Sequence, residues 1–88
     1  MKYTVIAVYG YNTKEETRDF EENCNTLKEA LDYICKRDED YYGPDQFTTK
    51  YRKFVNRRRP FVDGEKFIAS SVSWLMKDNY DGYIIVKA

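Results

Sequence analysis

No histidine occurs anywhere in this 88-residue chain. Histidine is the commonest general acid–base group near neutral pH and the commonest metal ligand, so its absence removes the usual basis for both kinds of site. The glycine patterns that cradle phosphates, G-x-x-x-x-G-K and G-x-G-x-x-G, are also missing from the sequence. The sequence therefore favours a protein that is not an enzyme and that uses no cofactor.

Long apolar runs and closely placed cysteines are missing as well. No run approaches the roughly 20 residues that span a bilayer. The start, MKYTVIAVYGYN, has no small-residue cleavage site and indicates a strand. A helix beginning between Cys24 and Cys35 would hold them about 15 Å apart, whereas a disulfide needs Cα atoms within about 7 Å. We expect free thiols and a cytoplasmic protein without a membrane partner.

Neither the thiols nor the acids form a convincing reactive site. Cys24 precedes a predicted helix N-terminus, where a thiolate is favoured, but no cationic base partner lies near it in the sequence. Cys35 belongs to an apolar stripe and is expected in the core. The stretch DEDYYG has a calcium-loop-like start, yet Tyr42 and Thr49 stand where ligands are needed. We expect an acidic turn and no metal site.

The chain is rich in aromatic and charged residues. It is 42% apolar and 34% charged, with nine tyrosines, five phenylalanines and one tryptophan, which indicates one globular domain over residues 1–88. Net charge is zero, but residues 1–49 hold six Lys and Arg against eleven Asp and Glu, and residues 50–88 hold nine against four. This asymmetry is a weak sign of charged partners, and it could equally bring the two halves of the fold together.

Two strands are predicted in the first part of the chain. Residues 3–11 are β-branched and aromatic, with apolar groups on both faces, which is typical of a central strand. Residues 17–24 carry carboxylates that suit an edge strand, with Phe20 and Cys24 on one apolar side.

Two helices are predicted next. Thr26 and Glu29 form a capping box, and the apolar spacing that follows predicts a helix near 27–37. The stretch DEDYYGPD predicts a loop. A second helix is expected near 46–58, because Asp45 can cap it and Pro60 disfavours helix at Arg59. Its apolar stripe contains Phe47, Tyr51, Phe54 and Val55.

The remaining residues predict two more strands. Residues 67–76 alternate, with Ile68, Val72, Trp74 and Met76 on one face. The stretch KDNYDG then predicts a hairpin turn into YIIVKA. The resulting order is ββααββ. It predicts an α+β fold in which two helices cover one face of a four-stranded antiparallel sheet.

The basic segment, residues 48–61 (TTKYRKFVNRRRPF), is the most distinctive feature. On a helix, Lys50, Lys53 and Arg57 fall together beside the apolar stripe, with Arg52 and Arg59 on its other side. Such cations commonly form a solvated face or suit a helix C-terminus. Three consecutive arginines exceed what a helix end requires. A protein partner and a nucleic-acid partner both remain open.

A nucleic-acid module would use the basic helix 48–59 for phosphates, with Tyr3, Tyr9 and Tyr11 on the first strand to stack bases. The zero net charge argues against a dedicated phosphate binder. The acidic strand and the DEDYY stretch would also repel nucleic acid that spread beyond the helix. Opposite patches on one small body suit a protein surface of mixed charge. The candidate partner-binding residues are Lys50, Arg52, Lys53, Arg57, Arg58, Arg59, Tyr41 and Tyr42.

In general character the chain resembles small phage-encoded accessory proteins, including anti-CRISPR inhibitors. The shared features are a compact single domain, abundant Tyr, Asp and Glu, as in DEDYYGPD, and the lack of a catalytic constellation. The resemblance transfers no functional residue. It implies an inhibitor or modulator that docks on a protein complex handling nucleic acid.

Overall fold

The computed structural model describes residues 2–42, 48–58 and 66–87. A four-stranded antiparallel sheet and helices confirm the predicted α+β class. The elements in chain order are β1 (Tyr3–Tyr9), β2 (Thr17–Cys24), α1 (Leu27–Tyr42), α2 (Thr48–Arg57), β3 (Phe67–Ala69), α3 (Ser71–Met76) and β4 (Gly82–Lys87).

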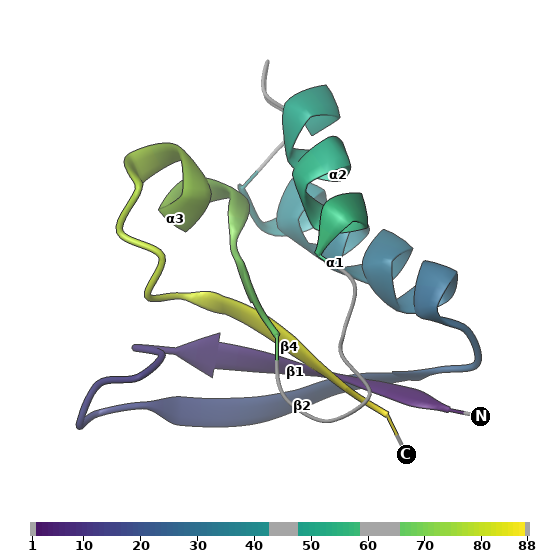
Figure 1. The fold of residues 1–88 in the computed structure, drawn as a ribbon, viewed down its shortest axis with the longest axis horizontal. Helices are drawn as coiled ribbons and strands as arrows, with labels where there is room; N and C mark the ends of the chain where they lie inside the picture. The colour runs from purple at the N-terminus through teal and green to yellow at the C-terminus, as the bar shows by residue number, and fades with distance from the viewer. Residues whose placement is uncertain (1, 43–47, 59–65, 88) are drawn as a thin grey trace.

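The sheet has the order β2-β1-β4-β3, with every neighbouring pair antiparallel (Figure 1). The predicted central position of β1 and edge position of β2 are both confirmed. Tyr3 pairs with Lys87, so the start of β1 lies beside the end of β4. At the other end of β4, Gly82 pairs with Ala69, and a Cβ built on Gly82 would lie 2.1 Å from the Ile68 carbonyl oxygen. Only glycine permits the backbones to approach this closely.

α1, α2 and α3 lie on the same side of the sheet (Figure 1). Between them and the sheet is one apolar core, because alternate residues of β1 and β4 point toward the helices. The fully or almost fully buried members of this core are Val5, Ala7, Cys24, Ala30, Leu31, Ile34, Cys35, Tyr51, Val55, Ile68, Tyr83 and Ile85.

α1 begins as predicted and ends later. The Glu29 backbone N–H donates to Thr26 Oγ1 at 3.1 Å, and Glu29 Oε2 accepts from the Asn25 backbone N–H at 2.9 Å. The capping pair therefore acts as expected, with Glu29 reaching one residue further back than in a standard box. The predicted loop at 38–42 is wrong, since α1 continues to Tyr42. Asp38 is buried there, so its carboxylate belongs to the fold and not to a solvated acidic turn.

α2 confirms the predicted helix where it can be compared. Tyr51 and Val55 are buried and Phe54 is half-buried, as the apolar stripe predicted. The expected cap at Asp45, the contribution of Phe47 and the boundary at Pro60 lie outside the described residues.

The predicted strand at 67–76 is wrong after its third residue. β3 ends at Ala69, and Ser70 then caps α3, with its hydroxyl oxygen accepting from the Ser73 backbone N–H at 3.2 Å. At the other end Lys77 adopts a left-handed conformation, φ 63°, and its N–H donates to the Trp74 carbonyl. The alternation of serines with apolar residues suggested a strand, but serine is also a preferred N-cap, and here capping prevailed.

A bulge in β2 makes the prediction that Phe20 and Cys24 lie on the same face wrong. Ile6 is opposite Phe20 whereas Val5 is opposite Glu22, so Glu21 is the inserted residue. The insertion reverses the alternation, which places Cys24 on the helix side and Phe20 on the opposite face. Cys24 is accordingly buried and Phe20 is exposed.

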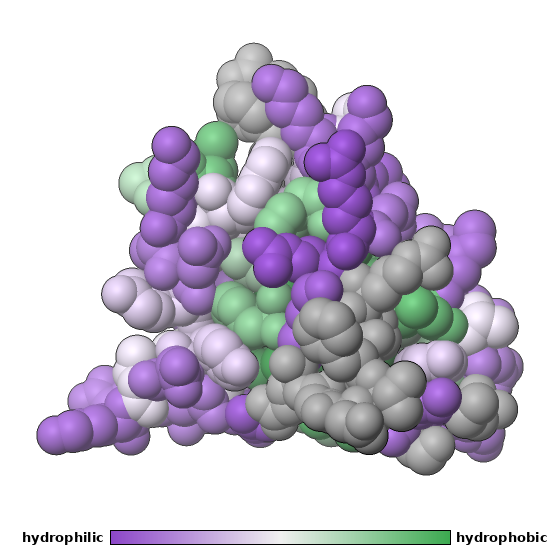
Figure 2. All heavy atoms as spheres, in the orientation of Figure 1, coloured by the Kyte–Doolittle hydropathy of each residue, from purple (hydrophilic) through white to green (hydrophobic). Residues whose placement is uncertain are grey.

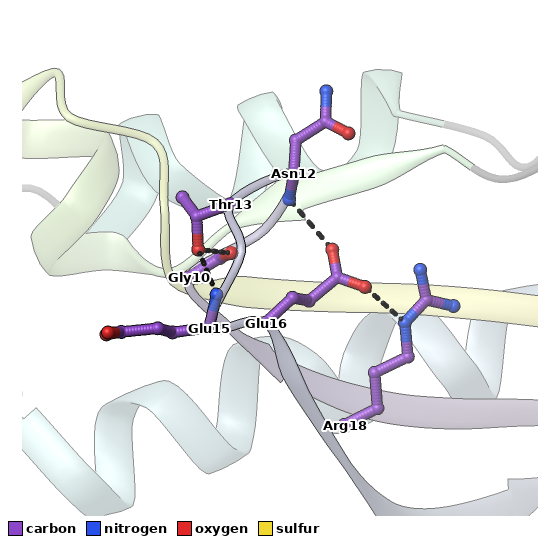
Figure 3. Close-up of polar contacts among 6 residues, drawn as sticks. All are labelled: Gly10, Asn12, Thr13, Glu15, Glu16 and Arg18. Atoms are coloured by element: carbon purple, nitrogen blue, oxygen red, sulfur yellow. Dashed lines mark hydrogen bonds and ion pairs between the residues drawn. The ribbon is translucent and has the colours of Figure 1, made fainter.

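The β1–β2 turn is closed by its own side chains (Figure 3). Gly10 and Asn12 both adopt left-handed conformations, each with φ 65°. The carboxylate of Glu16 accepts from the Asn12 backbone N–H at 2.8 Å and from Arg18 Nε at 3.0 Å. One acid thereby joins the turn to the start of β2. These polar groups of the acidic half are therefore structural.

Candidate binding surface

The cations of the basic segment do not share one environment. Lys50, Lys53 and Arg57 are exposed on α2, and Arg58 follows its last residue. Arg52 is half-buried and forms an ion pair with Glu39 of α1 at 2.7 Å. Arg52 therefore helps to hold the two helices together, and its role as a contact residue loses support. Arg59 lies outside the described residues.

A groove of about 510 Å³ runs between α2 and α3. Its floor is aromatic: the rings of Phe54 and Trp74 stack with centroids 5.3 Å apart and planes 24° apart. Tyr51 lies 6.1 Å from each of these rings, measured between centroids, and completes the cluster from the core side. The groove is lined by Lys50, Phe54, Arg58, Trp74, Leu75, Lys77 and Asn79.

The rim of the groove is cationic. Lys50 and Arg58 contribute from the α2 side and Lys77 from the end of α3. The Arg58 guanidinium carbon lies 4.9 Å from the centroid of the Phe54 ring, which is a cation–π arrangement. Among the described residues that line the groove, none is acidic.

α3 also carries exposed aliphatic side chains, of which Leu75 lines the groove. This helix has six residues, and three of them are large apolar residues with substantial exposure: Val72 (41%), Leu75 (45%) and Met76 (68%). Figure 2 shows hydrophobic atoms at the surface over α3 and between α3 and α2, bordered by hydrophilic side chains. The sequence had placed these residues on a strand, so the apolar part of the surface was not predicted. Ser70 as a helix N-cap was the available signal.

Tyr41 and Tyr42 belong to a different place. Both are exposed in the last turn of α1, where their rings meet edge to face at 4.9 Å. Together with Tyr9, Arg37 and Asp81 they line a small hollow of about 40 Å³, and Tyr41 also lines another of about 500 Å³ beside Lys36. Among the described lining residues, neither hollow shares one with the groove. The structure does not bring the two tyrosines together with Lys50 and Arg58.

The predicted base-stacking tyrosines do not form one exposed platform. Tyr3 packs against the core beneath the helices. Tyr11 is already stacked on Phe67, with centroids 4.3 Å apart and planes 6° apart. Of the three, Tyr9 is the exposed one.

A buried polar network holds α3 in place. Asp38 accepts hydrogen bonds from the Tyr83 hydroxyl and, at 2.7 Å, from the Ser71 backbone N–H. Arg37 donates to the Tyr83 hydroxyl oxygen at 2.9 Å and pairs with Glu21 at 3.0 Å. Burial and the Asp38 carboxylate raise the pKa of Tyr83, so its hydroxyl keeps its proton. The network connects β2, α1, β4 and α3 and fixes one wall of the groove.

The thiols are buried and unactivated. Cys24 and Cys35 are both free, as predicted. Burial, followed by the carboxylates of Glu22 and Glu29, raises the pKa of Cys24. Burial also raises the pKa of Cys35 to about 11. At neutral pH both remain thiols, and a thiol is a weak nucleophile.

Within residues 2–42, 48–58 and 66–87, no three His, Cys, Asp or Glu side chains gather closely enough to hold a metal ion. In that same part of the chain, no helix combines the length and the apolar character that crossing a membrane requires. Comparison with protein families, with curated proteins and with solved structures finds no match to this chain.

Proposed function

We propose that this chain is a small, non-enzymatic binding protein that inhibits or modulates a protein complex that handles nucleic acid, by docking on its surface. One observation carries the proposal. Exposed Leu75 of α3 lines a groove that has an aromatic floor and a rim of cations, and exposed Met76 follows it on the same helix. Contiguous apolar and aromatic surface bordered by charge is typical of protein–protein contacts, in which aromatic and arginine side chains supply most of the binding energy.

The distribution of charge supports a nucleic-acid-handling complex as the partner. Enzymes that act on phosphodiester bonds carry carboxylates that hold metal ions, and they carry basic channels for the backbone. This chain presents cations on α2 and exposed carboxylates such as Asp19 and Glu22 on β2. The cations on α2 are complementary to the carboxylates of such a partner, and the carboxylates on β2 are complementary to its basic channel. The resemblance to phage accessory proteins points in the same direction.

A nucleic-acid-binding module is the second candidate. Phe54 and Trp74 beside Lys50, Arg58 and Lys77 combine rings with cations, which is how single strands are commonly bound. The exposed aliphatic side chains of α3 favour a protein instead, because they offer a base neither stacking nor hydrogen bonds. The zero net charge also provides little long-range attraction for a polyanion.

The test is the triple variant Lys50→Glu, Lys53→Glu, Arg57→Glu, with folding checked by circular dichroism. Its control is Lys2→Glu, Lys14→Glu, Lys36→Glu, which makes the same change in net charge at exposed positions outside the groove. Affinity capture from bacterial lysate, read by mass spectrometry, should recover components of one nucleic-acid-handling complex with wild type and control only. Neither protein should retain DNA or RNA at physiological salt. Tight nucleic-acid binding by purified wild type, lost in the triple variant, would instead establish the second candidate.

A further inference from the structure

We infer that the groove between α2 and α3 binds an acidic protein segment, which inserts a large apolar side chain into the groove. The inference rests on the proposed function and specifies the part of the partner that is bound. Its chemistry follows from three features of the described lining residues: an aromatic floor, charged side chains that are all cations, and the aliphatic side chain of Leu75 on the α3 side.

The floor selects an apolar side chain. Phe54 and Trp74 are both only half-buried although they stack on each other and rest on buried Tyr51. Their outer surfaces are therefore still in contact with water, which gives an incoming apolar group a favourable area to cover. A volume of about 510 Å³ is ample for a Leu, Phe or Trp side chain together with the backbone that carries it.

The rim selects acidic neighbours for that side chain. Three cations, Lys50, Arg58 and Lys77, line the groove, and no described lining residue is acidic. The Arg58 guanidinium lies over the Phe54 ring, and its planar set of N–H donors can bind a carboxylate through two parallel hydrogen bonds. Segments with Asp or Glu on both sides of an apolar anchor fit this rim. Basic segments are repelled by it.

The aliphatic side chains of α3 select a protein over a nucleic acid. Leu75 lines the groove itself, and exposed Val72 and Met76 lie on the same short helix. Methionine adapts its shape to irregular apolar surfaces, and such side chains are common at protein-binding sites. An oligonucleotide would leave these side chains uncovered, whereas a polypeptide with a second apolar residue would bury them.

The groove is formed before any partner arrives. Asp38 ties Ser71 at the start of α3 to α1, and the Tyr51 hydroxyl donates to the Ala69 carbonyl at 3.0 Å. Both walls are thereby attached to buried groups of the core. Because the walls are already ordered, this protein loses little conformational entropy when a partner binds.

Trp74 is the only tryptophan in the chain, so its fluorescence reports directly on occupancy of the groove. The probe is a displayed library of random peptides of about 12 residues, which span roughly 18 Å as helices. Selection on the full chain should enrich peptides with several Asp or Glu residues around a Leu, Phe or Trp. Synthetic copies made without tryptophan should then change the Trp74 emission on titration.

The matched variants are Leu75→Ser with Lys77→Glu in the groove, and Val86→Ser with Lys87→Glu on β4, which is outside it. The groove variant should weaken the selected peptides about tenfold or more, and the β4 variant should leave them unchanged. Equal weakening by both variants, or enrichment without acidic bias, would overturn the inference. So would oligothymidine binding that changes Trp74 emission at lower concentration than any selected peptide.

Failure here is distinguishable from failure of the proposed function. If capture of a nucleic-acid-handling complex depends on Lys50, Lys53 and Arg57 while the groove variant captures it normally, the inference is wrong and the function stands. If acidic peptides occupy the groove but no such complex is captured, the inference stands and the proposed partner is wrong.

Discussion

Asp38 of α1 accepts a hydrogen bond from the Ser71 backbone N–H, with 2.7 Å between Oδ2 and the nitrogen. The same carboxylate accepts from the Tyr83 hydroxyl of β4. A buried acid thus satisfies an amide in the first turn of α3, which that short helix cannot satisfy internally. This contact joins the core to the groove, and it has consequences for stability and for binding.

Replacement of Asp38 by Ala should destabilise the protein by about 1–3 kcal/mol, because it leaves the Tyr83 hydroxyl and the Ser71 N–H without their acceptor. Urea unfolding measures the change. Hydrogen exchange at the amides of α3 should accelerate at the same time. Asp40→Ala, on the exposed side of the same helix, is the control and should change stability by less than about 0.5 kcal/mol. Unchanged exchange in α3 would show that Asp38 does not hold this helix.

Gly82→Ala should destabilise the sheet by about 1–3 kcal/mol or more, because the new methyl group would lie 2.1 Å from the Ile68 carbonyl oxygen and 2.8 Å from the Ala69 Cα. Both neighbours are backbone atoms, so β3 and β4 must move apart. Thermal unfolding compared with Lys87→Ala, an exposed change on the same strand, tests this. Equal melting temperatures for the two variants would contradict the close approach.

Leu31→Asp should unfold the domain, because it places a carboxylate without a partner in the core beneath α1. A loss on the order of 4 kcal/mol or more is expected, which is a large part of the stability of a small domain. Circular dichroism on heating measures it. Asp32→Ala removes an exposed carboxylate that pairs with Lys28 and serves as the control. A retained cooperative transition near the wild-type temperature would mean that the buried face of α1 is misassigned.

Stability should fall on the alkaline side of pH 9. The pKa of Cys35 rises from 9.0 to about 11 on folding, so the folded state holds this proton more tightly than the unfolded state does. The resulting stabilisation is complete below pH 9 and is lost as pH approaches 11, at about 1.4 kcal/mol per pH unit. Tyr51 and Tyr83, whose pKa values are also raised by burial, act in the same direction at higher pH. Urea unfolding of wild type and Cys35→Ala over this range should give a shallower slope for the variant. Parallel slopes would remove Cys35 as a cause.

The sequence alone determined the elements whose signals are local. Thr26 and Glu29 specified the start of α1 through contacts within one turn, and the stripe of Tyr51, Phe54 and Val55 specified the buried side of α2. The edge position of β2 followed from its carboxylates, and the class of the fold followed from the order of strands and helices. Two free cysteines were also correctly predicted from their separation along the chain.

Tertiary contacts decided the remaining features. Asp38 extends α1 through a stretch with loop-like composition because its carboxylate has partners on β4 and α3, which are distant in sequence. The bulge at Glu21 reverses the faces of β2, and the carboxylate of this inserted residue pairs with Arg37 of α1. Among the candidate contact residues, Arg52 forms an ion pair with Glu39 within the fold, whereas Lys50 and Arg58 line a groove together with Trp74. No periodicity in the chain encodes which cations pair internally and which border an apolar floor. That choice depends on which side chains meet when separate elements pack against each other.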